Sequence, residues 1–315
     1  MDNKPLVSVC MITYNHERYI SQAIEGVLNQ KTDFPIELVV GEDCSTDSTR
    51  DICLEYEKNH PEIVKVVARE SNLGIMPNFV DSLKRCRGKY IALCEGDDYW
   101  MDENKLSIQI GFLEANPQYS GACTTVKRFD ERTSSWKHEK SHRALPSELD
   151  IGTSDLLNDF FIYTPTFVFR NNLFDVNVLA DYSFGDKFIQ LLASSHGPIR
   201  FINEKTAVYR IQSAGAMHTT IPANPYKFYK DYYDFLTYFD RYTNFEFETA
   251  ITRKKQYLRN LWILSDRSKN ALRKSFAGLG HLLHKKTEKS FNEVRNVAAL
   301  AFPRAYATAK RLLRK

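Results

Sequence analysis

Three carboxylates crowd the four-residue stretch "EGDD" (95–98), directly after the apolar run "YIALC". Like charges this close repel one another, so the stretch is costly unless a cation lies among them. Carboxylates are hard oxygen donors, and a Mg²⁺-like ion takes only one or two of them together with substrate phosphates. The stretch therefore predicts a Mn²⁺ or Mg²⁺ site. The alternative is that Asp98 caps the next helix and Glu95 is a solvated strand end.

A second acidic group lies in "GEDCSTDST" (41–49), again after an apolar run. The carboxylate of Asp43 can accept hydrogen bonds from a base N–H or a ribose hydroxyl. Ser45 and Asp47 are typical helix caps, and capping is the competing interpretation of this stretch. Capping leaves Glu42 and Asp43 unexplained.

The apolar pattern predicts how the chain brings these groups together. Buried strands are expected at 6–12, 36–42, 63–68 and 89–95, each followed by a segment of helical period. Asn15 is the expected N-cap of the first helix, the second runs from about 47 to 59, Pro77 opens the third and Pro117 closes the fourth. This alternation predicts an α/β fold with a mostly parallel sheet flanked by helices. Because ligands bind outside the carboxyl ends of such strands, we expect 13–15, 42–47, 72–74 and 95–98 at one rim.

The pattern is weaker in the next hundred residues. Residues 128–150 are polar without a period and predict a surface insertion. An apolar pattern returns at 164–170, and a helix is expected at 186–195, short strands at 199–203 and 206–211, and a mobile lid at 212–220. From Pro225 the chain is expected to be helical, with Tyr and Phe packing in a core.

Several classes of protein are excluded or disfavoured. The chain has neither GxGxxG nor GxxxxGK[ST], so the two commonest nucleotide sites are excluded, and "DDYWMDENKL" lacks the glycine of an EF-hand. The six cysteines form no CxxC pair and predict reduced core residues. We expect no signal peptide and no membrane-spanning segment, because no apolar run approaches about 20 residues.

Four stretches together resemble the family 2 glycosyltransferases: "VSVCMITYNHERYISQAIEGVLNQ", "ELVVGEDCSTDSTRDIC", "NLG" and "KYIALCEGDDYW". The likeness spans about residues 5–215. It implies a GT-A fold and a metal-dependent, inverting transfer of a hexosyl or N-acetylhexosaminyl group. The donor would be a nucleotide sugar, commonly a UDP-sugar, and the acceptor a hydroxyl of a saccharide or lipid-linked saccharide. A non-catalytic sugar-nucleotide-binding relative and a sugar-phosphate nucleotidyltransferase are the alternatives, although "TYNHERYI" lacks the glycines that the latter usually needs.

The resemblance also implies roles for single residues. Asp97 is the expected direct metal ligand, with Glu95 and Asp98 beside it, and Asp186 at the start of a helix is the expected general base. Asp186 has a simpler interpretation as an N-terminal helix residue favoured by the helix dipole. Arg210 has two interpretations, a contact to the diphosphate or a structural ion pair. His218 also has two, a ligand of the metal or diphosphate or a solvated loop histidine. The remaining expected donor-binding residues are Thr13, Tyr14, Asn15, Glu17, Asp43, Asn72, Gly74, Glu95 and Gly96.

Charge separates the chain into an acidic body and a basic tail. Residues 251–315 hold 17 Lys and Arg against three acids, about +14, which leaves about −10 of the net +4 for residues 1–250. We expect a catalytic domain at 1–222, with a donor half (1–125) and an acceptor half (126–222), and a helical, basic region at 223–315. That region is a solvated appendage or binds anionic lipid peripherally at the inner face of a membrane, in an otherwise cytoplasmic protein. Nucleic-acid binding is not expected.

Overall fold

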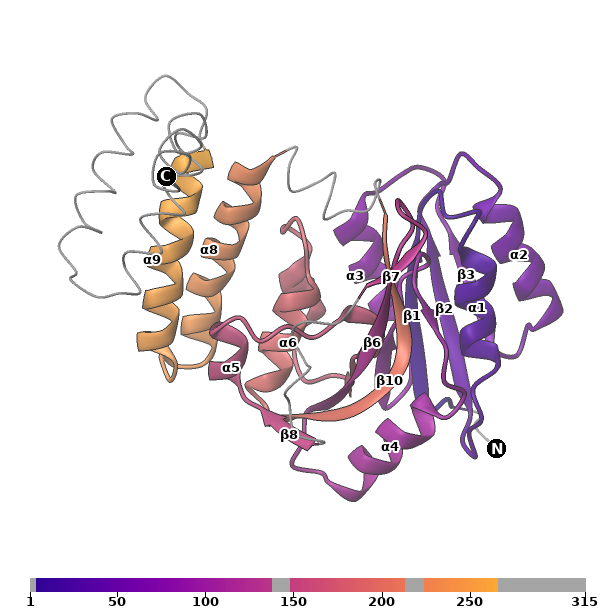
Figure 1. Ribbon diagram of the computed structural model, residues 1–315, viewed down its shortest axis with the longest axis horizontal. Helices are drawn as coiled ribbons and strands as arrows, with labels where there is room; N and C mark the ends of the chain where they lie inside the picture. The colour runs from indigo at the N-terminus through magenta and orange to yellow at the C-terminus, as the bar shows by residue number, and fades with distance from the viewer. Residues whose placement is uncertain (1–3, 138–147, 213–223, 266–315) are drawn as a thin grey trace, which may run out of the picture. The chain divides into compact units, whose positions relative to one another are not determined.

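The computed structural model describes residues 4–137, 148–212 and 224–265 of the 315-residue chain. The chain divides into two compact units, Met1–Gly215 and Ala216–Lys315. Figure 1 shows the first unit as a central sheet flanked by helices and the described part of the second as a pair of long helices.

The first unit is built on one ten-stranded mixed sheet. Its main path runs β3-β2-β1-β4-β9-β6-β10-β5, with β7 added to β6 and β8 to β10. Strands β1 to β4 are paired in parallel, and the antiparallel β9 lies between β4 and β6. The carboxyl ends of β1, β2, β3, β4, β6 and β10 therefore lie at the same edge of the sheet. The strands are β1 (Val7–Thr13), β2 (Ile36–Glu42), β3 (Val64–Ala68), β4 (Tyr90–Leu93), β5 (Tyr99–Trp100), β6 (Gly121–Asp130), β7 (Ser135–Lys137), β8 (Glu148–Ile151), β9 (Val168–Arg170) and β10 (Ile199–Ile211).

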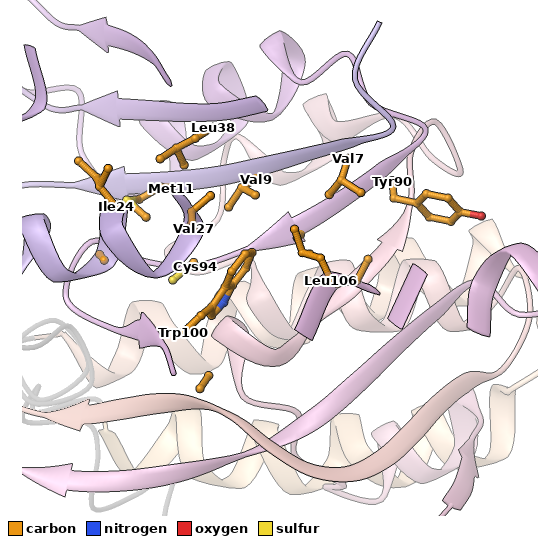
Figure 2. Packing of buried hydrophobic residues seen from close by; sticks show 14 of the residues in the cluster. Val7, Val9, Met11, Ile24, Val27, Leu38, Tyr90, Cys94, Trp100 and Leu106 are labelled. Atoms are coloured by element: carbon orange, nitrogen blue, oxygen red, sulfur yellow. The ribbon is translucent and has the colours of Figure 1, made fainter. Parts of the chain in front are cut away.

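Helices cover both faces of this sheet, as continuous apolar strands require. They are α1 (Ile20–Leu28), α2 (Thr49–Asn59), α3 (Ile75–Arg85), α4 (Lys105–Ala115), α5 (Thr153–Leu157) and α6 (Asp186–Ser194), with short 3₁₀ turns η1 (Thr164–Thr166) and η2 (Val176–Leu179). One core joins α1 and α4 to alternate residues of β1, and it includes Val9, Ile24, Leu106 and Trp100 (Figure 2). Gly41 of β2 packs closely against α3, because a Cβ added to Gly41 would lie 2.1 Å from the Ser82 hydroxyl oxygen.

The predicted α/β fold with a mostly parallel sheet is confirmed, and β2 spans the predicted residues. All six cysteines are free, and five of them are buried, as predicted.

Four local expectations are wrong. Asn15 does not cap the first helix, which begins at Ile20 after Tyr19, and α3 begins at Ile75, ahead of Pro77. The expected insertion at 128–150 contains the end of β6 together with β7 and β8. The two short strands expected at 199–203 and 206–211 are one strand, β10, whose register on β6 shifts between Phe201 and Ala207.

Lys105 is a charged residue inside the core of this unit. It is 0% exposed, its Nζ donates to Gln109 Oε1 at 2.6 Å, and it lies 4.3 Å from the centre of the Trp100 ring. Burial lowers the pKa of Lys105 to about 7, so the folded protein binds the proton of this amine less tightly than the unfolded chain does.

We expect Lys105→Met to change how stability depends on pH. Between pH 7 and about 10.5 the unfolded wild type holds this proton and the folded wild type does not, so Lys105 makes stability rise with pH. The variant lacks that term, and its free energy of unfolding relative to wild type should fall by roughly 2–3 kcal/mol from pH 7 to 9.5. Urea unfolding across this range measures the difference, and a constant difference would show that Lys105 keeps an ordinary pKa.

The second unit is a helical hairpin in its described part. Helix α8 (Pro225–Tyr242) packs against α9 (Glu248–Ser265), and the Asn224 side chain caps α8 by accepting from Lys227 N at 3.0 Å. The aromatic residues of α8 are confirmed as helical, with Phe235 and Phe239 fully buried. No helix in the described part of the chain is both long and apolar enough to span a membrane. Most of the basic tail lies outside the described residues.

Candidate active site

The "EGDD" turn leaves β4 at the shared carboxyl edge and lies against the end of β1. Gly96 N donates to Ile12 O at 3.0 Å, which fixes the turn beside the last residues of β1. Gly96 must be small, because a Cβ there would lie 2.8 Å from Thr13 Cβ and 3.1 Å from His16 Nδ1. Thr13 is itself buried, and its hydroxyl lies 3.2 Å from His16 Nδ1. The turn and the segment after β1 therefore form one packed unit.

We expect Gly96→Ala to displace the acidic turn. The added methyl group meets the Cβ of a β-branched residue in a strand, which cannot swing aside, and such overpacking typically costs about 1–3 kcal/mol. The variant should lose thermal stability and weaken Mn²⁺ binding. Gly111→Ala is the matched control, because a Cβ there meets nothing within 4 Å and a helical glycine generally gains stability on this change. Equal melting temperatures for wild type and Gly96→Ala would contradict the packing argument.

Each acid of the turn has its own hydrogen-bond partner. The Thr164 side chain hydrogen-bonds to Glu95, Gln212 Nε2 donates to Asp97 Oδ2 at 3.0 Å, and Arg210 N donates to Asp98 Oδ1 at 2.7 Å. Burial, together with the charges of Asp97 and Asp186, raises the pKa of Glu95 to about 8. Burial and the charges of Asp97 and Glu95 raise the pKa of Asp98 well above its usual range. The protein's own groups therefore do not fully stabilise the charged forms of these carboxylates.

These residues fit a divalent cation of the Mg²⁺ or Mn²⁺ type. The donors are carboxylate oxygens, which such ions prefer, and a bound cation would offset the burial and the crowding that raise two of the pKa values. In the described ranges no group of three or more His, Cys, Asp or Glu side chains gathers as a metal cage. Asp97 and Glu95 can therefore supply part of a coordination shell, and a diphosphate and water would have to supply the rest. The interpretation of Asp98 as a helix cap is wrong, because the next helix, α4, has Asn104 at its N-cap.

Asp186 is the first residue of α6 and lies near the acidic turn. Its carboxylate accepts from Lys187 N at 2.8 Å, and its charge contributes to the raised pKa of Glu95. Burial raises the pKa of Asp186 itself above the usual value of a carboxylate. A carboxylate whose pKa is raised by burial suits general-base chemistry. Its neighbour Gly185 packs against the end of the Met76 side chain on α3.

Three residues near these acids were missed by the sequence reasoning. Tyr209 on β10 is close enough to Glu95, Asp97, Asp98 and Asp186 to be affected by their charges. Burial is the main cause that raises the pKa of its hydroxyl, and these four charges raise it further. Thr164 reaches Glu95 from η1, and His16, whose pKa burial lowers, lies within the electrostatic range of Asp97. His16 could have been found, because it stands inside the "TYNHE" segment. Nothing in the local sequence singles out Thr164 or Tyr209.

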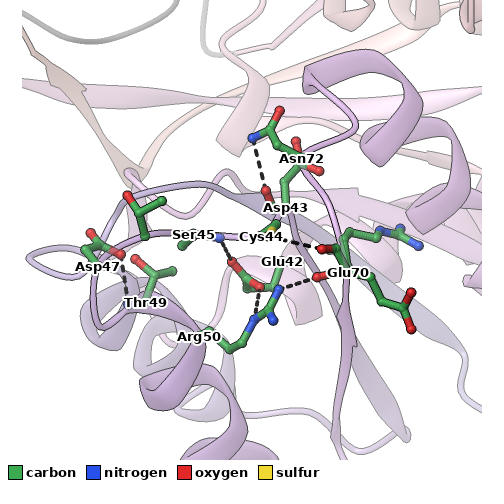
Figure 3. Close-up of polar contacts among 12 residues, drawn as sticks. Glu42, Asp43, Cys44, Ser45, Asp47, Thr49, Arg50, Glu70 and Asn72 are labelled. Carbon is green, nitrogen blue, oxygen red and sulfur yellow. Dashed lines mark hydrogen bonds and ion pairs between the residues drawn. The ribbon is translucent and has the colours of Figure 1, made fainter.

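Asp43 connects the end of β2 to the segment after β3 (Figure 3). Its carboxylate accepts from Leu73 N at 2.8 Å and from Gly74 N at 2.9 Å, and Asn72 Nδ2 donates to Asp43 O at 3.0 Å. Gly74 has a φ of +88°, a conformation that favours glycine. The structure thus brings Asp43, Asn72 and Gly74 together at the rim, and their contact with a base or ribose stays a prediction.

Glu42 has a structural partner that the sequence did not reveal. It is 0% exposed, accepts from Ser45 N at 2.7 Å, and pairs with Arg50 Nε at 2.6 Å (Figure 3). Arg50 also donates to Arg69 O, so the pair joins β2, α2 and the end of β3. Glu42 is thereby accounted for by this ion pair.

Hydrogen bonds between backbone and side-chain atoms join the segment after β1 to the segment after β2. Asn15 has a φ of +55°, its N donates to Ser45 Oγ at 3.0 Å, and its side-chain oxygen accepts from Thr46 N at 2.8 Å. Glu17 accepts from Ser48 N and its own N donates to Asp47 Oδ2. Tyr14 is 42% exposed at this edge. Asn15 and Glu17 therefore hold these two segments of the rim together.

His218, and the expected lid at 212–220 apart from Gln212, lie outside the described residues. The roles predicted for His218 stay predictions.

The family model for glycosyl transferase family 2 matches residues 8–178, more than half of the chain. The chain belongs to this family. A Mycobacterium tuberculosis protein, Rv1520, is 33% identical over 213 residues, 68% of this chain and 61% of its own length. The chain thus matches about three fifths of that relative. The putative teichuronic acid biosynthesis glycosyltransferase TuaG of Bacillus subtilis is 40% identical over 110 residues, 35% of this chain and 42% of TuaG.

Solved structures show that this family 2 chain has a GT-A fold. S. aureus TarS 1–349, in complex with UDP-GlcNAc, matches with a TM-score of 0.67 and 19% identity, over 95% of this chain and 87% of TarS 1–349. The mannosyltransferase PcManGT of Pyrobaculum calidifontis, in complex with GDP-Man and Mn²⁺, matches with a TM-score of 0.58 and 17% identity, over 97% of this chain and 83% of that protein. At these identities the likeness establishes the fold alone.

Proposed function

We propose that this family 2 chain is an inverting glycosyltransferase that moves a hexosyl or N-acetylhexosaminyl group from a nucleotide sugar to an acceptor hydroxyl. The observation that carries the proposal is the acidic turn of Glu95, Asp97 and Asp98 at the carboxyl edge of the sheet, close enough to Asp186 for all four charges to act on Tyr209. The complexes of TarS with UDP-GlcNAc and of PcManGT with GDP-Man support a nucleotide sugar as donor. A UDP-sugar is the first choice, bound by Asp43 and the segments 13–17 and 72–74.

Asp97 and Glu95 serve the departing diphosphate, and Asp186 serves the acceptor hydroxyl. Asp97, with Glu95, would hold Mn²⁺ or Mg²⁺, which when bound offsets the charge that grows on the departing diphosphate. Asp186 accepts the proton of the acceptor hydroxyl as the oxygen forms a bond to the anomeric carbon. The bond from that carbon to the diphosphate oxygen breaks, and the nucleoside diphosphate leaves with the electron pair. A single attack opposite the leaving group inverts the anomeric configuration.

Calorimetry with UDP-, GDP- and dTDP-sugars, each with and without Mn²⁺, tests donor binding by the full chain. We expect at least one donor to bind with Mn²⁺ and to bind more weakly after chelation. Release of nucleoside diphosphate from the bound donor separates an enzyme from a non-catalytic relative, and NMR of the product shows its anomeric configuration. Failure of every donor to bind in saturating Mn²⁺ would reject the proposal, and release of pyrophosphate from a nucleoside triphosphate and a sugar phosphate would favour a nucleotidyltransferase.

The basic tail is proposed to bring the enzyme to an anionic membrane surface, where a lipid-linked saccharide or a growing surface polysaccharide would be the acceptor. This rests on the charge of residues 251–315, with 17 Lys and Arg against three acids. Pelleting with anionic vesicles should therefore fall when residues 285–315 are deleted, and unchanged pelleting would remove the idea. The donor half (1–125) and acceptor half (126–222) are likewise proposed assignments.

A further inference from the structure

Arg210, near the end of β10, is a nearly buried cation whose guanidinium is surrounded by polar partners and two aromatic rings. The side chain is 6% exposed. Its Nη1 donates to Asp97 O at 2.7 Å, its Nη2 donates to Gln22 Oε1, and its Nε lies 3.4 Å from Glu131 Oε1. The rings of Tyr19 and Tyr99 lie 5.0 and 4.6 Å from the guanidinium carbon. Little of this cation is therefore presented to a ligand.

The same end of β10 holds the acidic turn at two further points. Arg210 N donates to Asp98 Oδ1 at 2.7 Å, and Gln212 Nε2 donates to Asp97 Oδ2 at 3.0 Å. On its other side the turn is held to β1 through Gly96 N and Ile12 O. Residues 95–98 are thus clamped between the ends of two strands that lie more than a hundred residues apart in the chain.

A clamp is needed because the turn carries three carboxylates that repel one another. When all three are charged, as in a metal-binding turn, separating them would lower their repulsion, and it would carry Asp97 away from the position in which it can bind a cation. Arg210 opposes this movement with a charge-assisted bond to the backbone between the two aspartates.

We propose that Arg210 is a positioning residue that holds Asp97 and Asp98 in place for a divalent cation and does not itself contact the donor's diphosphate. The inference rests on the proposed function, since it assumes that the turn binds a metal. The planar fork of the guanidinium makes the contacts to Asp97 O, Gln22 and Glu131 together, which a lysine ammonium cannot reproduce. Arg210→Lys should therefore behave like Arg210→Gln, although it keeps the charge.

The test separates metal affinity from donor affinity in the full chain. Free Mn²⁺ is measured by electron paramagnetic resonance during titration at fixed UDP, and UDP binding is then measured by calorimetry in saturating Mn²⁺. Both variants should bind Mn²⁺ at least about tenfold more weakly than wild type, as is typical when the support of a metal ligand is removed. Their affinity for UDP should return to within about threefold of wild type once Mn²⁺ is saturating.

Arg200→Gln is the matched control, because Arg200 lies at the other end of β10, is similarly enclosed, and pairs with Glu148 and Asp150. It should leave Mn²⁺ affinity unchanged. If the Arg210 variants bind UDP weakly even in saturating Mn²⁺, Arg210 contacts the phosphates and the inference is overturned. Unchanged Mn²⁺ affinity in these variants would also overturn it.

If Arg210→Gln does not fold, Gln22→Leu, which removes one acceptor of the guanidinium, decides in the same assay: weaker Mn²⁺ binding supports the inference and unchanged binding overturns it. Failure of the wild type itself to bind Mn²⁺ and UDP would instead reject the proposed function.

Discussion

Asp97→Ala is expected to abolish Mn²⁺-dependent binding of the donor while the protein stays folded. Asp97 follows Gly96 in the turn, it is the expected direct metal ligand, and its charge adds to the raised pKa values of Glu95 and Asp98. Removing that charge relieves repulsion within a crowded cluster, so the melting temperature should not fall. Calorimetry with UDP in saturating Mn²⁺, alongside thermal unfolding, measures both effects.

Glu103→Ala provides the control for Asp97→Ala, since Glu103 is an acid of the same segment that forms only an exposed pair with Lys31. Its loss should change neither binding nor stability noticeably. Donor binding by Asp97→Ala that still responds to Mn²⁺ as in wild type would place the metal elsewhere.

Asp186→Asn is expected to lower turnover by about 10²–10⁴-fold, the usual contribution of a general base, while donor binding survives. Asparagine keeps the shape of the side chain and its place at the first turn of α6, but it cannot accept the proton of the acceptor hydroxyl. Calorimetry should show donor affinity close to that of wild type, and Asp181→Asn, at an exposed acid shortly before α6, should keep full turnover. Full activity in Asp186→Asn would show that another group is the base.

The pH profile gives a second readout for Asp186. Because burial raises its pKa in the folded protein, protonation should remove activity as the pH falls through a value above that of an ordinary carboxylate. The acidic limb of the kcat/KM profile of the wild type should therefore lie at a higher pH than an ordinary carboxylate would produce. It should be missing from the residual activity of Asp186→Asn, and an acidic limb that persists in the variant belongs to a different group.

Local sequence determined the alternation of the longer strands and helices in the first 115 residues and the family of this protein. Alternating apolar runs and helical periods are local properties, so β2 and the ends of α2 and α4 lie where the pattern places them. The rim followed from a general rule: parallel strands present their carboxyl ends at one edge, which gathers the residues after β1, β2, β3 and β4.

Only the tertiary structure decided what single polar residues do at that rim. Ser45, read as a helix cap, accepts from Asn15 thirty residues away, Glu42 is matched by Arg50, and Arg210 reaches the acidic turn across more than a hundred residues. Whether β10 is one strand or two also depended on its pairing with β6. A carboxylate or guanidinium takes whichever partner the folded chain brings within hydrogen-bond distance, and spacing along the sequence does not encode that distance.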